Sequence, residues 1–252
     1  MRTALLVSLM MTFAVATELP AQSKRTKKSD TQKTQKAPKD DKKTAKDKVI
    51  RALDKFRKSK AKTKSKSWRT RLPQPPVQRF NPKLQYLWYL DTSVGPLVIT
   101  LLPEAAPNHV SSVIFLSRCG FYNGLQFPRV LTGFMAQGGS PSNTLSGDPG
   151  YTMDGEFLTK QKHDKPGALS AANSGPGTDG SQFFLTFVPT PHLDDLHTVH
   201  GFVTEGTKTL KAIESRGVEK DGQTLKEKVT ILRTWIRVID APKKVESSDD
   251  KK

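Results

Sequence analysis

The chain has 252 residues and a formal net charge of +17 at pH 7, so it is long enough for one large domain or two small ones. Its one cysteine, Cys119, excludes an intrachain disulfide and a cysteine-based metal cluster. The charge is unevenly placed. Residues 24–71 carry 21 basic and 5 acidic residues, a net of +16, whereas residues 72–252 carry 19 and 18, a net of +1. The basic character therefore belongs to a tail, and the rest of the chain is nearly neutral.

The first residues have the pattern of a secretory signal. Arg2 gives a positive start, and residues 4–15 form an apolar run that is too short to span a bilayer well. Small residues at Ala16 and Ala21 offer two cleavage sites. The alternative is an uncleaved membrane anchor. Under either interpretation we expect an exported protein of the periplasm or cell envelope, with residues 1–21 as the signal.

Residues 22–83 are expected to be a Lys-rich disordered tail followed by a connector rich in Pro and Arg from residue 68 to 82. Within the tail, residues 48–60 have either the pattern of a solvated linker, which we favour, or that of a short basic amphipathic helix on an anionic surface. The tail suits an anionic envelope polymer or a membrane surface as partner. It has too few aromatic residues for specific nucleic-acid binding. Residues 241–252 are expected to be a second disordered tail.

The globular region is expected from residue 84 to 240 and to be mainly β. Its first two strands form a hairpin with a turn at residues 92–96. One helix opens at Pro107 and ends at Gly120, and a second covers residues 207–215. Such short strands with two helices predict an antiparallel barrel whose ends the helices cover. The predicted strands are residues 84–90, 97–102, 127–131, 134–137, 168–172, 182–187, 198–203 and 229–239.

Several long runs in this region resemble the cyclophilin-type peptidyl-prolyl isomerases, in the order and spacing of that family. They cover residues 120–124, 127–130, 133–139, 167–173, 175–184 and 193–201. The resemblance implies a closed eight-stranded antiparallel barrel capped by two α-helices. It also implies an enzyme of the bacterial, exported type that acts on proline-containing polypeptides, needs no cofactor or metal, and is expected to be a monomer.

The resemblance also assigns a site. An X-Pro bond rotates slowly because amide resonance must be broken, at a barrier of roughly 20 kcal/mol. An apolar pocket and one fixed cation suffice to lower that barrier. By spacing alone Arg129 would point outward into solvent, but the resemblance makes it the catalytic cation. The substrate-binding residues that the resemblance implies are Phe134, Met135, Gln137, Ala172, Asn173, Gln182, Phe184, Leu193 and His197.

The sequence contains residues that suggest three other kinds of site. Ser181, His197 and Asp194 are triad residue types, but residues 180–182 lack a nucleophile-elbow pattern. His197 would face the opposite side of a strand from His200, which argues against a metal site with His192. The glycine-rich runs lack a P-loop lysine. A cyclophilin-like binding module without turnover and a surface tether with an incidental barrel stay open as alternatives. The sequence departs from the commonest family pattern at Pro128, Ser174, His192, Asp195 and Leu196.

Overall fold

The computed structural model describes residues 38–157, 159, 161–220 and 226–242. All described residues belong to one compact unit, within residues 34–252. The predicted signal and the first part of the predicted tail lie outside the described residues, as does most of residues 241–252. No helix within the described ranges has the length and the apolar character needed to cross a bilayer.

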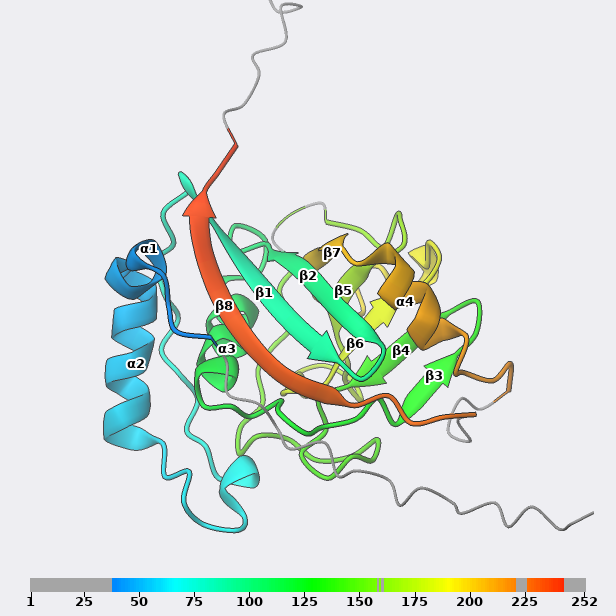
Figure 1. The fold of residues 1–252 in the computed structure, drawn as a ribbon, viewed down its shortest axis with the longest axis horizontal. Helices are drawn as coiled ribbons and strands as arrows, with labels where there is room; N and C mark the ends of the chain where they lie inside the picture. The colour runs from blue at the N-terminus through cyan, green and yellow to red at the C-terminus, as the bar shows by residue number, and fades with distance from the viewer. Residues whose placement is uncertain (1–37, 158, 160, 221–225, 243–252) are drawn as a thin grey trace, which may run out of the picture. The chain divides into compact units, whose positions relative to one another are not determined.

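The fold is mainly β, with eight antiparallel strands in one sheet, ordered β3-β4-β6-β5-β7-β2-β1-β8 (Figure 1). Each predicted strand is present, and the predicted hairpin is confirmed as β1 and β2. The strands are β1 Leu84–Thr92, β2 Gly95–Leu101, β3 Arg129–Leu131, β4 Met135–Gly138, β5 Ala168–Ala171, β6 Phe183–Thr186, β7 Val199–Glu205 and β8 Ile231–Asp240.

The sheet does not close into a barrel, and the expectation of a closed barrel is wrong. Its two outer strands, β3 and β8, are not paired with each other. The chain just before β3 approaches the start of β8 instead, through backbone bonds from Gly124 N to Ile231 O (2.7 Å), Ile231 N to Leu125 O (2.7 Å) and Phe127 N to Val229 O (3.0 Å). These bonds end at Phe127, and the chain then enters β3, which pairs with β4.

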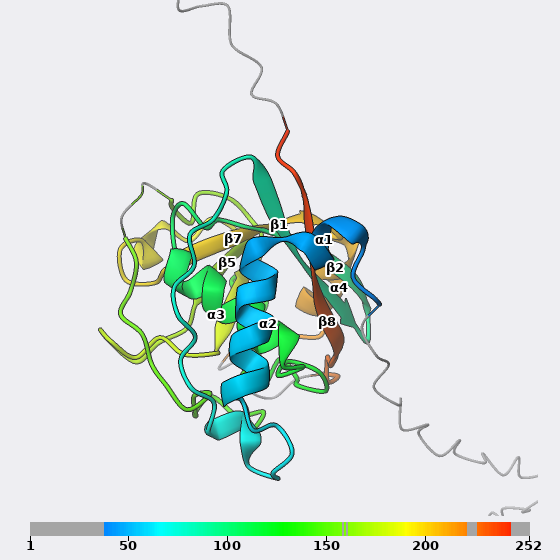
Figure 2. The ribbon, with the colours of Figure 1, turned by 90° about the vertical axis from the view of Figure 1, so that its left-hand side faces the viewer.

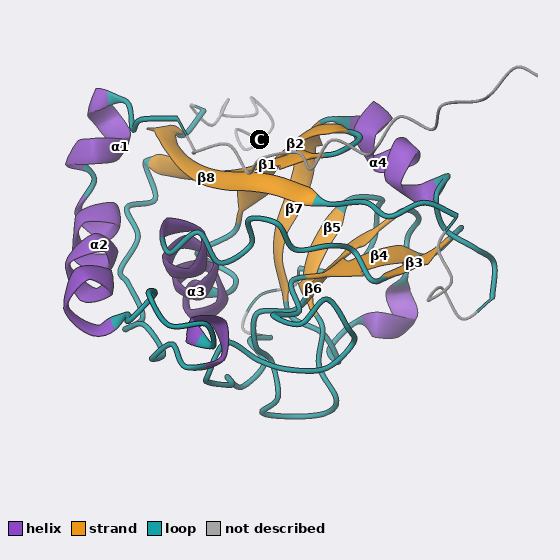
Figure 3. Ribbon diagram, turned by 60° about the horizontal axis from the view of Figure 1, so that its bottom comes forward, coloured by secondary structure: helices purple, strands orange, loops and turns teal. Residues whose placement is uncertain are grey.

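The two predicted helices are confirmed as α3, Pro107–Arg118, and α4, Thr207–Glu214. Proline in the first turn of α3 fits because its missing N–H would have no helical partner there. α4 packs against β2, β3 and β4, at the opposite end of the sheet from α3 (Figures 1 and 3).

Part of the segment expected to be disordered is helical. Residues Lys42–Lys46 form α1 and Lys48–Lys60 form α2, so the preference for a solvated linker is wrong. α2 lies alongside α3 (Figure 2), and its residues Val49, Ile50 and Leu53 are buried. The segment is mostly polar, but one narrow face of the helix is apolar. The helix is stable only because the domain covers that face.

The connector that follows α2 is also fixed to the domain. The Arg69 guanidinium donates to the carbonyls of Phe121 and Asn123, each at 2.8 Å. The backbone N–H of Leu72 donates to Pro149 O at 2.8 Å, and its side chain is buried. These contacts dock the connector on the domain.

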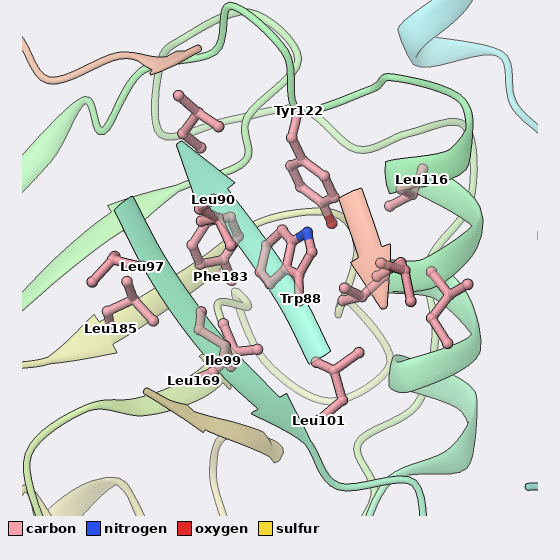
Figure 4. Packing of buried hydrophobic residues seen from close by; sticks show 14 of the residues in the cluster. Trp88, Leu90, Leu97, Ile99, Leu101, Leu116, Tyr122, Leu169, Phe183 and Leu185 are labelled. Atoms are coloured by element: carbon pink, nitrogen blue, oxygen red, sulfur yellow. The ribbon is translucent and has the colours of Figure 1, made fainter. Parts of the chain in front are cut away.

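The core lies between the sheet and the helices, and aromatic rings occupy much of it (Figure 4). Trp88 of β1 packs with Tyr122 at a centroid distance of 5.0 Å and with Phe183 of β6 at 5.2 Å. Edge-to-face contacts of this kind add to the stabilisation by buried area. The core row of β3, β4, β6 and β5 consists of Val130, Ala136, Leu185 and Leu169, which are directly paired.

Candidate active site

The site is built on the row of paired residues next to that core row. Arg129 of β3 is opposite Gln137 of β4, and Gln137 is opposite Phe184 of β6. Directly opposed residues of antiparallel strands point to the same face of the sheet. Met135 lies two residues before Gln137 and shares that face. Strand pairing therefore gathers these four side chains on the face away from the core row.

A pocket of ≈ 240 Å³ lies on this face. Its lining contains nine of the ten predicted site residues: Arg129, Phe134, Met135, Gln137, Ala172, Asn173, Phe184, Leu193 and His197. The tenth, Gln182, lies beside the lining rather than in it. Its Oε1 accepts a hydrogen bond from Gln137 Nε2 at 3.1 Å, and its own Nε2 donates to Gly147 O at 2.9 Å.

One glycine is needed for this arrangement. Gly139 follows β4 with a φ of +84°, and a Cβ atom there would lie 2.4 Å from Ser181 O. Only glycine permits both that backbone conformation and that approach. The chain beyond Gln137 can therefore run close to the segment that carries Gln182.

Ring contacts hold the apolar walls of the pocket. Phe184 meets His197 edge to face at a centroid distance of 5.3 Å, and Phe134 stacks on His192 at 5.7 Å. The Nδ1 of His197 lies 2.9 Å from Ala171 O, which fixes the orientation of the imidazole ring. Leu193 lies in a short 3-10 turn, Pro191–Leu193, that brings this wall to the pocket.

His163, which the sequence did not predict as a site residue, packs against Phe184. Its ring stacks on Phe184 at 5.8 Å, its Nδ1 lies 2.8 Å from Asp194 Oδ1, and its Nε2 lies 3.0 Å from Ser170 Oγ. Burial lowers the pKa of His163 and outweighs the opposing effect of Asp194. The neutral ring then donates from Nδ1 to the carboxylate and accepts the Ser170 hydroxyl at Nε2. No local sequence pattern points to this contact.

A buried ionic cluster next to the pocket was also missed. His109, at the start of α3, lies 2.6 Å from Glu156 Oε2 through Nδ1 and 2.8 Å from Asp179 Oδ2 through Nε2. Burial by itself would lower the pKa of His109, but the carboxylates of Asp179 and Glu156 raise it above its ordinary value. Hydrogen bonds from His109 in turn lower the pKa values of both carboxylates, which are therefore charged. Glu156 also accepts the backbone N–H groups of Asn108 and His109, so it caps α3. The three residues are far apart in sequence, and only the fold brings them together.

The other sites considered from sequence are not assembled. The Ser181 hydroxyl donates to Gly139 O at 2.8 Å and is buried. His200 is buried beside His109, with ring centroids 5.6 Å apart, and burial lowers its pKa to about 3. Within the described ranges no three His, Cys, Asp or Glu side chains form a group that suits a metal ion.

Comparison with known proteins identifies the family. The sequence model described as "Cyclophilin type peptidyl-prolyl cis-trans isomerase/CLD" matches residues 87–236. The chain belongs to this family. In sequence, this cyclophilin is 46% identical over 134 residues to peptidyl-prolyl cis-trans isomerase B of Bacillus subtilis, which covers 53% of this chain and 94% of that protein.

Longer relatives contain the same domain. The cyclophilin is 40% identical over 151 residues to peptidylprolyl isomerase domain and WD repeat-containing protein 1 of Mus musculus, which covers 59% of this chain but 23% of that protein. The chain thus spans about a quarter of the length of such relatives. Among solved structures, a cyclophilin-type isomerase of Cryptosporidium parvum, crystallised in the presence of the dipeptide Ala-Pro, superposes with a TM-score of 0.57. It is 29% identical and covers 60% of this chain and 98% of that one.

Proposed function

We propose that the chain catalyses cis-trans isomerisation of X-Pro bonds in polypeptides. The observation that carries the proposal is one arrangement: Arg129 lies at a pocket of ≈ 240 Å³ whose lining also includes Phe134, Met135, Phe184 and Leu193. The pocket has room for a proline ring and not for a large ligand. The Ala-Pro dipeptide named with the Cryptosporidium parvum structure supports a proline-containing substrate.

The proposed chemistry needs positioning and one cation. The apolar lining holds the proline ring and removes water around the imide bond. As the bond twists, the nitrogen lone pair loses its resonance with the carbonyl and becomes a hydrogen-bond acceptor. Arg129 then donates to that nitrogen, and because this bond forms only in the twisted state it lowers the barrier rather than tightening ground-state binding.

The polar residues of the site have a different proposed role. Gln137, Gln182 and Asn173, together with the Ala172 backbone, are placed to bind the peptide main chain on both sides of the proline. Gln137 and Gln182 are already joined at 3.1 Å, so their amide groups are oriented before a substrate arrives. Preorganisation of this kind reduces the entropy lost on binding.

The test is an isomerisation assay of the full chain on an Ala-Pro peptide, with exchange between cis and trans followed by NMR. Faster exchange with wild-type protein than with Arg129→Ala supports an enzyme. Peptide binding without faster exchange would mean a cyclophilin-like binding module without turnover, and absence of both would overturn the proposal.

We further propose that the chain acts on exported proteins. Support comes only from the sequence, through the signal pattern at residues 1–21. N-terminal sequencing of protein from the native host tests it. A mature N-terminus at Thr17 or Gln22 is expected, and an intact Met1 on cytoplasmic protein would contradict export.

A second proposed function, binding of an anionic envelope polymer, is favoured by how charges are arranged on α2. Four of its five exposed basic residues recur every three or four positions and form one stripe: Lys48, Arg51, Lys55 and Lys58. Ten residues of helix place this stripe along about 15 Å of the surface. We call these four residues the basic stripe.

The acidic residues of the same segment form ion pairs and hydrogen bonds with the domain. Asp40 and Asp54 pair with Arg118 of α3, and Asp41 pairs with Arg237 of β8 at 2.8 Å. Asp47 accepts hydrogen bonds from Ile50 N and Tyr86 Oη. Asp54 also pairs with Arg57 of α2 at 3.3 Å. The acidic groups therefore hold the helices on the domain, and in the described part of the chain none of them forms an ion pair with a residue of the basic stripe.

The same packing argues against two other partners. The apolar side chains of α2 are buried in the domain, so they are not available for insertion into a lipid bilayer. Phe56 and Trp68, the aromatic residues of the segment, contact Phe115 and Phe121 and are not free to stack on bases. A polymer bound by its charge alone fits the basic stripe better.

A further inference from the structure

A second pocket, of ≈ 470 Å³, adjoins the proposed proline pocket and shares two lining residues with it, Asn173 and His197. We call it the adjoining pocket. Its lining comes from three stretches of chain: residues 154, 155 and 157, residues 173, 175–177 and 179, and residues 195–197. The Asn173 side chain marks the boundary and is held there, because its Nδ2 donates to Leu196 O at 3.0 Å.

Two apolar side chains in the adjoining pocket are unusually exposed. Leu196 is 62% exposed and Phe157 is 46% exposed. Leu196 follows Asp195, whose φ of +59° is rare for a residue with a side chain. The turn thus holds Leu196 outward, where its burial by a ligand would remove apolar area from water.

The pocket is also acidic. Asp154 and Asp195 line it, and among the described residues no Lys or Arg does. Asp195 is partly neutralised by Lys162 at 2.7 Å, and Asp179 is committed to His109. Asp154 has no such ion pair among the described residues, and it lies against Gly177, where a Cβ atom would be 3.2 Å from its Oδ1. Asp154 is therefore the carboxylate of this pocket that can form an ion pair with a ligand.

Apolar walls next to a carboxylate match one kind of side chain, a long methylene stem that ends in a cation. We propose that the adjoining pocket is a subsite for a Lys or Arg side chain of the substrate, carried on the residue directly before or directly after the proline. The stem packs on Leu196 and Phe157, and the charged head faces Asp154. This inference rests on the proposed isomerase function, because the proline fixes where the side chain enters.

The distance between the pockets suits this assignment. Both pockets are lined by Asn173 and His197, so they adjoin at these two side chains. An extended peptide advances roughly 3.3–3.6 Å per residue, so a neighbour of the bound proline already lies at the entrance. A lysine stem then spans the remaining way to the carboxylate.

The experiment compares three peptides that differ only at the residue before proline, which is Lys, norleucine or Glu. Norleucine keeps the stem and removes the charge. Both kcat/KM for isomerisation and the Kd of a fluorescent version of each peptide are measured on the full chain. We expect the order Lys, norleucine, Glu, with about three- to tenfold between successive peptides, as for a partly exposed ion pair and a partly buried stem. The same three residues placed directly after the proline form a second series, which covers the other direction of approach.

Variants assign the effect to the pocket. Asp154→Asn should remove the advantage of Lys over norleucine and leave norleucine unchanged, whereas Leu196→Ser should weaken Lys and norleucine alike. Ile239→Ser is the matched control, because Ile239 is an exposed apolar residue on β8 that does not line the pocket, and it should change nothing. Equal values for the three peptides in both series, or a Lys preference that survives Asp154→Asn, would overturn the subsite. Failure of the isomerase proposal looks different: no peptide is isomerised, while the Kd series still reports whether the subsite exists.

Discussion

Asp47 and Tyr86 are joined across 39 residues by a buried hydrogen bond of 3.0 Å from Tyr86 Oη to Asp47 Oδ2. The other oxygen of the same carboxylate accepts Ile50 N at 2.9 Å and caps α2. One side chain thus both starts the helix and attaches it to β1. Because the cap and the attachment share a carboxylate, helix formation and docking are coupled.

This coupling predicts that Tyr86→Phe lowers the free energy of unfolding by about 1–3 kcal/mol, because it leaves a buried carboxylate oxygen without its donor. Urea denaturation checks the value. Tyr89→Phe is the control: Tyr89 lies on the same strand, stacks on Trp235 at 5.0 Å, and should change stability by less than about 0.5 kcal/mol. Equal effects of the two substitutions would show that the hydrogen bond contributes little.

A second prediction concerns the buried face of α2. Leu53 is fully buried, so Leu53→Ala should cost about 2–5 kcal/mol through lost burial and a cavity. A chain that begins at residue 72 loses Val49 and Ile50 as well, so we expect it to be less stable than the full chain. A comparison of this shortened chain with the full chain would then mix the role of the tail with a loss of stability. Thermal unfolding of Leu53→Ala beside Ala52→Gly, an exposed position on the same helix, tests this. A smaller shift for Leu53→Ala would contradict docking.

The helix α2 illustrates what sequence could and could not predict. The spacing of Ile50, Leu53 and Phe56 did indicate a helical face, and Asp47 is a favourable N-cap. A composition dominated by Lys nevertheless favours disorder, because nothing local reveals that the domain covers that face, where Phe115 contacts Phe56. Non-local burial decided the outcome.

The pocket around Arg129 could be predicted for the opposite reason. Its residues fall in long runs whose order and spacing carry the family pattern, and strand pairing then aligns Arg129, Gln137 and Phe184. The buried cluster of His109, Glu156 and Asp179 has no such pattern, since each residue sits in a different part of the sequence. Charged residues that come together only through the fold have no regular spacing in the sequence, so a sequence pattern cannot predict their contact.

The third prediction tests the proposed role of Arg129. Arg129→Ala should lower kcat/KM for an Ala-Pro peptide by about 100- to 1000-fold, because it removes a hydrogen bond made mainly in the transition state. Arg129→Lys should recover part of the loss, since lysine keeps the charge but not the shape of the donor. Arg51→Ala, at an exposed position on α2, is the control and should keep full activity. Unchanged turnover by a folded Arg129→Ala protein would overturn the mechanism.

The fourth prediction is a pH dependence of stability. The pKa of buried His200 is lowered to about 3 from 6.5, so between these values the unfolded chain binds a proton that the folded chain does not. Stability is then lost as pH falls below 6.5, by up to about 1.4 kcal/mol per pH unit from this residue. The lowered pKa of His163 acts in the same direction. His109, with a raised pKa, contributes stability that is fully present below 6.5 and lost only as pH rises through its folded value.

Urea denaturation between about pH 5.5 and 6.5 isolates these histidines. The ordinary pKa values of Glu156 and Asp179 are 4.5 and 3.8 and are lowered in the folded chain, so both carboxylates are charged in the folded and in the unfolded chain at these pH values. His200→Phe should flatten the slope. Thr198 O loses the ring donor but still accepts Ala171 N at 3.0 Å, so the substitution leaves no bare carbonyl. His192→Phe, at an exposed position, should leave the slope as it is. An unchanged slope in His200→Phe would show that this histidine is not the buried base.

The last prediction concerns the basic stripe on α2. Replacing Arg51, Lys55 and Lys58 by Gln removes three outward charges and keeps good helix formers, so the fold should be preserved. The matched control replaces Lys208, Lys211 and Lys228, which are exposed elsewhere on the domain, and changes the net charge equally. If the stripe binds a linear polyanion, the α2 variant should elute from heparin at clearly lower salt, whereas the control should elute close to wild type. Equal shifts would mean that net charge alone governs retention. Tight binding to anionic vesicles that survives high salt would contradict a charge-only site, because binding through the stripe must weaken as salt screens it.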